Sequence, residues 1–242
     1  MYADEMDLYN ASHTYITAPM NGDWEEHVMN HPERKAELVL WNLERPGSGE
    51  IRAYRDANVA KVQSNIIDKI IVSDRFLARQ TGHQYVPLGC HFGLGDPGTT
   101  KEYDVAHLAC YAPRRAWLFD YLTPLQHYNG VSIAPNGWGE ERHKTLQETR
   151  FMLCVHQDEH PIIEPLRYAI AVAYGLPIIS EYSEDIFPYT PEEVQIVSPI
   201  QRFPIELFRM RSNYYLYKDV ALRVRQRMCT DMSFRKCLEK YL

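Results

Sequence analysis

The sequence lacks any apolar run approaching the roughly 20 residues that are needed to cross a lipid bilayer. It also lacks internal repeats and low-complexity segments. Residues 1–5 are acidic, whereas a secretory signal peptide starts with a basic segment followed by an apolar one. These absences predict a cytoplasmic protein without a membrane span.

Cysteine is scarce, and its spacing excludes the usual cysteine frameworks. The five cysteines are an odd set without a C-x-x-C pair, which argues against both a disulfide scaffold and a zinc ribbon. A reducing compartment fits this usage best. The cysteines are Cys90, Cys110, Cys154, Cys229 and Cys237.

The composition itself is ordinary for a folded protein. Hydrophobic residues make up 45% and charged residues 24%, which excludes wholesale disorder, and 242 residues allow one large domain or two small ones. The net charge of -6 is uneven, because residues 209–242 hold nine Lys/Arg and three Asp/Glu, leaving -12 on the rest. Such a basic tail suits an anion, a nucleic acid or the acidic body of the chain itself. On a helix its cations would point in several directions, which favours a solvated or domain-clamping helix.

Short strands and helices alternate along the chain, first weakly and then clearly. In the first part we expect strands at Tyr15–Ala18, Glu37–Leu43, Lys69–Ser73 and Gln84–Leu88. Two helices are expected there, at Asp56–Asn65 and Arg75–Gln80. In the second part we expect strands at Tyr103–Cys110, Val131–Ala134, Phe151–Val155, Leu176–Ser180 and Val194–Val197. The helices expected there are Pro113–Tyr121, Glu140–Thr149, Pro161–Tyr174 and Asn213–Met228.

This alternation predicts an α/β protein with two Rossmann-like domains, each built on a parallel sheet covered on both faces. The Gly- and Pro-rich segment Cys90–Lys101 has no periodicity and reads as the linker, with a hinge between Gly93 and Gly98. We therefore expect a reduced first domain over 1–95, a nucleotide-binding domain over 96–212 and a basic helical segment over 213–242.

Gly93, Gly95 and Gly98 form a literal G-x-G-x-x-G, the fingerprint of dinucleotide-binding sites. That fingerprint requires a preceding strand and a helix that begins at the glycines, so that its N–H groups meet the pyrophosphate. Here a strand is expected to follow instead, and Pro97 stands where the helix would form. The glycines therefore suit a hinge better than a cofactor site.

Three loops at the carboxyl edge of the second sheet carry groups suited to a phosphorylated ligand, because ligands of open α/β sheets bind there. Arg114 and Arg115 stand at a helix start, where the helix dipole and the guanidinium forks both favour phosphate, although such arginines are often only surface residues. The loop Asn136, Gly137, Trp138, Gly139 offers close backbone approach and a flat indole face; its alternative is a turn with Trp138 in the core.

The third loop follows an almost wholly apolar strand and packs ionisable residues between His156 and Arg167. His156 and His160 are four apart, but the glutamate is misplaced for H-E-x-x-H and the span begins on a strand, so we expect no metal. Glu164 and Arg167 are three apart and share a helix face, where they suit a ribose diol and a diphosphate, or a purely structural ion pair.

The span His156–Glu181 resembles the donor-binding segment of glycosyltransferases with the GT-B fold. The resemblance is carried by the acidic loop, the helix beginning near a glutamate and the following G-x-P-I-I strand. It implies donor contacts at Glu164, Arg167 and Glu181, with His156 beside them; it also implies diphosphate contacts at Arg114 and Arg115 and a base pocket at residues 136–139.

The resemblance implies a transferase that moves a hexosyl or related group from a nucleotide diphosphate sugar, without a metal or other cofactor. The acceptor would be a glycan, a small molecule or, through the basic tail, a modified nucleic acid. Candidates for a catalytic base are His13, Asp23 and Asp74. The chain departs from the family in its short first half and in Ile170, which stands near the second Glu of the E-x7-E pattern. A non-catalytic nucleotide-sugar binder and an epimerase are the alternatives.

Overall fold

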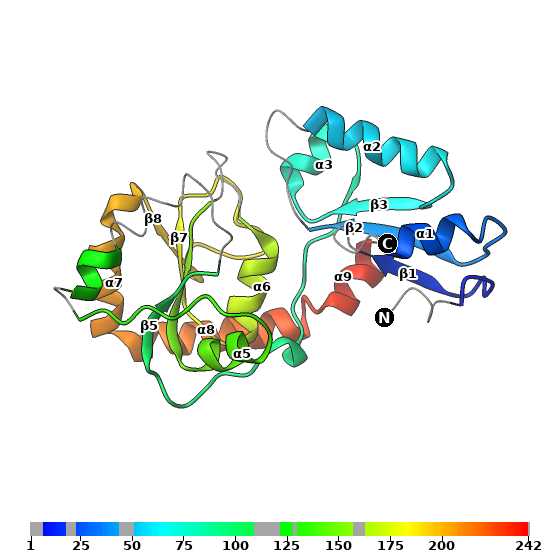
Figure 1. Ribbon diagram of the computed structural model, residues 1–242. Helices are drawn as coiled ribbons and strands as arrows, with labels where there is room; N and C mark the ends of the chain where they lie inside the picture. Colours follow the sequence, from blue (N-terminus) through cyan, green and yellow to red (C-terminus); the bar gives the residue numbers. More distant parts are fainter. Residues whose placement is uncertain are drawn as a thin grey trace. The chain divides into compact units, whose positions relative to one another are not determined.

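A computed structural model describes residues 7–17, 23–43, 51–108, 122–127, 130–156 and 163–241. The chain divides into two compact units, one ending at Pro87 and the other running from Leu88 to Lys240. Each unit holds a four-stranded parallel sheet with helices around it (Figure 1). The predicted α/β architecture with two separate parallel sheets is confirmed. The units divide at Pro87 rather than at residue 95, and residues 213–240 belong to the second unit.

The first sheet has the strand order β1-β2-β3-β4. All four of its strands fall where the apolar runs predict them, and β2 is buried along nearly its whole length, because helices cover the sheet. The elements are β1 (Thr14–Thr17), α1 (Asp23–Met29), β2 (Glu37–Asn42), α2 (Ile51–Gln63), β3 (Lys69–Val72), α3 (Arg75–Thr81) and β4 (Gln84–Tyr85). Figure 1 shows α2 and α3 side by side. The short helix α1 was not expected, since only Trp24 and Val28 among its residues mark a buried face.

The second sheet has the order β5-β6-β7-β8 and lies between two apolar clusters. Along β6, Phe151 and Leu153 face one cluster while Met152 and Cys154 face the other, which explains why this strand reads as continuously apolar. The strands are β5 (Tyr103–Ala106), β6 (Thr149–Cys154), β7 (Ile178–Glu181) and β8 (Val194–Val197). The helices are η2 (Phe92–Leu94), α5 (Gly139–Gln147), α6 (Pro165–Ala173), η3 (Ile200–Arg202), α7 (Phe203–Ser212), α8 (Tyr214–Thr230) and α9 (Phe234–Tyr241), with a further turn of helix at 122–127. None of the described helices is both long and apolar enough to span a membrane.

Some of the expected elements differ from the structure in kind or in their bounds. The strand expected at Val131–Ala134 is a single bridge from Ile133 to Val105, and the Ser132 N–H donates to the side-chain carboxylate of Asp104 in β5 instead of to a backbone carbonyl. Within the described residues, the helix expected from Pro161 begins at Pro165, which occupies the first helical position, where a proline is tolerated. The expected helix Pro113–Tyr121 lies outside the described residues.

The glycine-rich segment that was expected to be a hinge packs tightly inside the second unit. A Cβ added at Gly95 would lie 2.4 Å from the Tyr174 ring, and one at Gly98 would lie 2.2 Å from the Gln147 carbonyl oxygen. Arg225 of α8 also donates to the Gly95 carbonyl at 3.0 Å. The glycines therefore serve close packing, and the division between the units lies before them.

The basic tail is largely neutralised within the chain. Arg225 and Arg227 reach acids distant in sequence, Asp96 at 3.0 Å and Glu193 at 2.6 Å, and they fix α8 to the body of the second unit. Pairs with nearer partners are Arg209–Glu206, Arg223–Asp219 and Arg235–Glu239. This pattern agrees with the interpretation of the tail as a domain-clamping helix.

Candidate functional site

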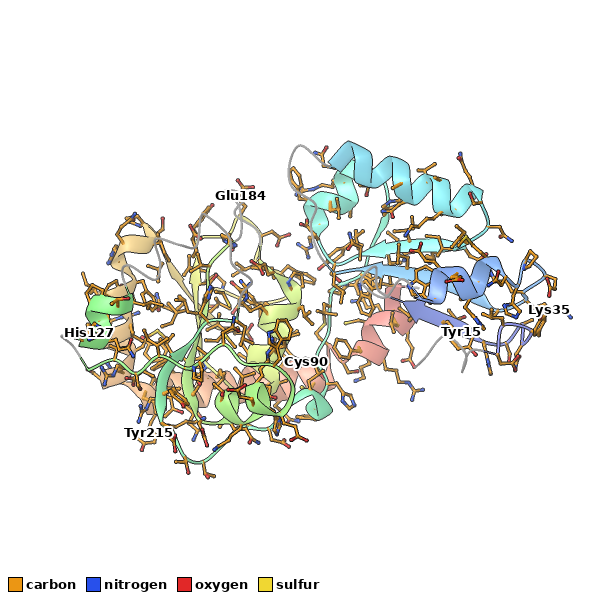
Figure 2. All side chains as sticks on the ribbon, in the orientation of Figure 1. Tyr15, Lys35, Cys90, His127, Glu184 and Tyr215 are labelled. Carbon is orange, nitrogen blue, oxygen red and sulfur yellow. The ribbon has the colours of Figure 1, made fainter. Side chains whose placement is uncertain are left out.

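The carboxyl edge of the second sheet is where its parallel strands all end. Glu184, three residues beyond β7, marks this edge in Figure 2. Because the carboxyl ends of parallel strands meet at one edge, the chain beyond β6 and β7 and the start of α6 are brought together there. Ligands of open α/β sheets bind at this edge, so the side chains placed on it form the candidate site.

Arg167, in the first turn of α6, ties two strand ends together. Its side chain is buried, with Nε donating to the Leu108 carbonyl at 2.6 Å and an Nη donating to the Val155 carbonyl at 3.1 Å. The other Nη lies 2.5 Å from the Glu164 carboxylate, so the pair predicted from i,i+3 spacing is present. Leu108 follows β5 and Val155 follows β6. The geometry gives Arg167 a positioning role at the site, and its direct contact with a diphosphate stays a prediction.

Glu164 occupies the position just before α6, where its side chain makes no capping bond to the helix backbone. The side chain keeps 34% of its surface exposed beside the buried Arg167. The amino end of α6 carries partial positive charge from the helix dipole, which stabilises nearby anions. A carboxylate and a helix N-terminus therefore lie together at the edge, one suited to hydroxyl donors and the other to negative charge.

His156 and Glu181 lie in direct contact across the ends of β6 and β7. The His156 backbone N–H donates to the Glu181 carboxylate at 3.2 Å. The buried His156 ring places Nε2 2.8 Å from the Tyr182 carbonyl and 3.2 Å from the Ser183 hydroxyl. The histidine thereby fixes the chain that leaves β7, while Glu181 remains partly exposed at its end. Two residues chosen from the sequence are thus joined.

A buried polar contact beneath this edge was not anticipated. The Tyr168 hydroxyl donates to the Ser180 hydroxyl, and the Ser180 hydroxyl lies 2.9 Å from the Glu181 carbonyl. Burial raises the pKa of Tyr168 well above its usual value, so the phenol stays neutral. The available signal was the single polar residue at the end of the apolar run Leu176–Ser180. The contact holds β7 against α6.

Trp138 lies on the surface at the start of α5 and keeps 70% of its surface exposed. The interpretation of this indole as a core residue is therefore wrong. The Arg142 guanidinium stacks on the ring, 3.9 Å from its centroid, and Arg142 Nε donates to the Gly137 carbonyl at 2.9 Å. Gly139 adopts a left-handed φ of 58° that suits glycine, and Asn136 is exposed in the same loop. The loop therefore holds a flat indole ring exposed to solvent.

No family model matches the sequence, and no curated protein does. Among solved structures, the chain is similar to Anabaena Alr3699/HepE in complex with UDP and glucose, with TM-score 0.62 and 10% identity over 93% of this chain and 77% of that one. It is also similar to AviGT4, a glycosyltransferase involved in avilamycin A biosynthesis, with TM-score 0.51 and 12% identity over 90% and 87% of the two chains. The chain has the GT-B fold.

The three candidate bases lie in the first unit, and Asp74 and His13 lie at different edges of its sheet. Asp74 follows β3 at the carboxyl edge, where its Oδ1 accepts the Leu77 N–H at 2.9 Å and caps α3. His13 precedes β1 and lies at the opposite edge, with its Nδ1 3.1 Å from the Tyr15 hydroxyl. Asp23 opens α1, and its side chain is outside the described part.

Other GT-B expectations fall on segments that are not described. Arg114 and Arg115, the implied diphosphate contacts, lie outside the described residues, as does His160. Within the described ranges, no group of three or more His, Cys, Asp or Glu side chains is arranged to hold a metal ion. The described site therefore consists of Glu164, Arg167, His156, Glu181 and the Trp138 loop.

Proposed function

We propose that this protein transfers a hexosyl or related sugar from a nucleotide diphosphate donor to a hydroxyl acceptor, without a metal. The observation that carries the proposal is a GT-B fold in which four residues implied by the family resemblance lie at one sheet edge. Arg167 pairs with Glu164 and donates to the Val155 carbonyl, next to His156 in the chain. The His156 backbone N–H in turn donates to the Glu181 carboxylate. The similar structure of Anabaena Alr3699/HepE holds UDP and glucose.

In this proposal the donor binds along the carboxyl edge of the second sheet. The exposed indole of Trp138 stacks on the base, and a carboxylate from Glu164 or Glu181 accepts hydrogen bonds from ribose or sugar hydroxyls. Negative charge grows on the departing diphosphate, and the amino end of α6 and the guanidinium groups expected at Arg114 and Arg115 stabilise it. Arg167 contributes by fixing the strand ends from which these groups extend.

An inverting reaction also requires a base that takes the proton from the acceptor hydroxyl. Asp74 follows β3 at the carboxyl edge of the first sheet, whereas His13 precedes β1. Asp74 is therefore better placed than His13 for this task, while Asp23 stays a candidate from the sequence. Asp74 already caps α3, so its replacement by Asn, which also caps, separates a proton-transfer role from a structural one.

The first experiment is a thermal-shift screen of nucleotide diphosphates and nucleotide sugars. A ligand at a hundredfold excess over Kd stabilises the native state by about 2.7 kcal/mol. The best donor is then incubated with and without acceptors, and the products are separated by chromatography. Release of nucleotide diphosphate supports the transferase; binding without turnover supports a binding protein, and conversion of the sugar without acceptor supports an epimerase. A screen without any stabilising nucleotide contradicts all three.

The variant Glu181→Gln tests whether the donor binds at the carboxyl edge of the second sheet. It should weaken donor affinity about tenfold, because a charged hydrogen-bond acceptor becomes neutral. Glu192→Gln, an exposed carboxylate before β8 at the opposite edge of the same sheet, removes the same charge and should leave affinity unchanged. Equal affinities for both variants, measured by calorimetry, would place the donor away from this edge.

A further inference from the structure

Four cations gather at the amino edge of the second sheet, opposite the candidate site. This cation cluster consists of Lys101 before β5, Arg150 at the start of β6, Arg211 at the end of α7 and Lys218 in α8. In Figure 2 the labelled Tyr215, at the start of α8, lies at the end of the second unit opposite Glu184. The cluster takes no part in the function proposed above.

Two of these cations share one carboxylate. Asp104, which is only 2% exposed, has one oxygen 2.9 Å from an Arg150 Nη and 3.2 Å from Arg211 Nε. Its other oxygen accepts the Ser132 N–H at 3.0 Å. A guanidinium carries five N–H donors, and about a third of each arginine side chain, 33% and 31%, is exposed. Both forks are thus held in place by Asp104 while part of each reaches solvent.

The two lysines add charge that the surrounding residues leave unbalanced. Lys101 Nζ donates to the Gln147 carbonyl at 2.7 Å, and Lys218 Nζ lies 6.0 Å from the centroid of the Tyr214 ring. Burial, together with the positive charges of Lys218 and Arg150, lowers the pKa of Lys101 to about 8. The lysine is therefore in a site that disfavours its own charge.

Two other acids near the cluster pair with cations outside it. Glu148, at the end of α5, lies 3.9 Å from Lys144, and Asp219 of α8 pairs with Arg223. Glu102 is exposed beside Lys101. Asp104, which pairs with both arginines, is the buried carboxylate, so four positive charges face one buried negative charge and the exposed Glu102.

We propose that the cation cluster binds a small phosphate-bearing anion at the amino edge of the second sheet. Two partly exposed guanidinium forks fixed by one carboxylate match the oxygens of a phosphate, and the two ammonium groups balance further charge. Asp104 already balances one of the four positive charges. An anion with several charges therefore suits the cluster better than a monocarboxylate, which would balance only one more. The proposal does not depend on glycosyl transfer.

The test uses inorganic pyrophosphate and the full-length chain. Calorimetry is carried out with the carboxyl edge saturated by the best nucleotide diphosphate of the screen, or without nucleotide if the screen finds none. The double variant Lys101→Gln with Lys218→Gln should bind pyrophosphate at least about a hundredfold more weakly, roughly tenfold for each lost charged hydrogen bond. Lys144→Gln, an exposed lysine in α5, is the matched control and should bind as the wild type does.

A second measurement does not depend on the variants. Lys101, with its lowered pKa, reacts readily with acetic anhydride, and pyrophosphate should protect it while leaving Lys144 reactive, as read by peptide mass spectrometry. Wild-type affinity in the folded double variant, or labelling of Lys101 that pyrophosphate does not change, would overturn the proposal. Neither outcome bears on nucleotide binding at the opposite edge, which is measured separately.

Discussion

Replacement of Arg167 by Met tests whether this residue holds the candidate site together. Met keeps the apolar stem but removes the ion pair with Glu164 and the bonds to the Leu108 and Val155 carbonyls. Hydrogen bonds from a charged donor contribute about 1.5–3 kcal/mol each. Breaking a buried ion pair typically costs about 3–5 kcal/mol, and the exposure of Glu164 lowers that share. We expect a loss of about 3 kcal/mol in the free energy of unfolding.

Urea unfolding followed by circular dichroism measures this loss. With a slope of about 2 kcal/mol per molar urea, the midpoint of the second unit should fall by about 1.5 M. Because the two units can unfold separately, hydrogen exchange of peptides from β5, β6 and α6 assigns the effect to the second unit. Glu164→Gln is the matched control: it keeps an acceptor in a half-exposed place and should cost about 1 kcal/mol or less.

The site itself should respond more strongly than the stability does. If Arg167 positions the strand ends, Arg167→Met should weaken donor binding even at low temperature, where the variant is fully folded. A change in stability of less than 1 kcal/mol would show that the three guanidinium contacts do not hold the edge. Unchanged donor affinity in the folded variant would show that the edge is not the donor site.

Three further predictions address the indole, the glycines and the cation cluster. Trp138→Ala should lose about 1–3 kcal/mol of donor affinity by calorimetry, whereas Phe92→Ala, also an exposed ring beneath an arginine, should lose none. Gly98→Ala should lower stability in urea by roughly 1–3 kcal/mol because its Cβ meets the backbone, while Gly93→Ala meets only a movable side chain and should be nearly neutral; equal effects would contradict the packing argument. The affinity of the cluster for sulfate should be constant below the Lys101 pKa of about 8 and should fall above it, because the anion binds the protonated amine. An affinity that does not change up to about pH 10 would show that Lys101 does not contact the anion.

The sequence pattern predicts the strands well where each apolar run is buried on both faces. β8 matches its predicted range to the residue, and β6 differs only at its ends. Helices α7 and α9 were not predicted. In α7 the buried Phe203, Leu207 and Met210 do follow helical spacing, but Pro204 stands in the run; in α9 only Cys237 is buried. One buried position in α9 leaves no period to detect, and in α7 the proline reads as a helix breaker.

The candidate site was predictable only where it depends on spacing along one element. The Glu164–Arg167 pair follows from i,i+3 geometry. The contacts of Arg167 with two carbonyl oxygens, and of His156 with Glu181, depend on where neighbouring strands end, and no side-chain pattern contains that information. Trp138 illustrates the same limit, because a Gly–Trp–Gly loop suits a buried and an exposed indole equally well. Tertiary structure decides between the two.

The basic tail shows most clearly why charge counted along the chain differs from charge in the fold. Three arginines of the tail form ion pairs with acids from residues 1–208: Arg211 with Asp104, Arg225 with Asp96, and Arg227 with Glu193. The positive charge of the tail is therefore largely balanced in the folded chain. Deletion of residues 209–242 would also remove the buried Val224 and Met228, so lost nucleic-acid binding in such a truncation would report unfolding. Neutralising exposed Arg223 by Gln removes a tail charge without touching the core. Because Asp219 already balances the charge of Arg223, the salt dependence of DNA retention should be the same in Arg223→Gln as in the wild type. A weaker salt dependence in the variant would support a nucleic-acid acceptor.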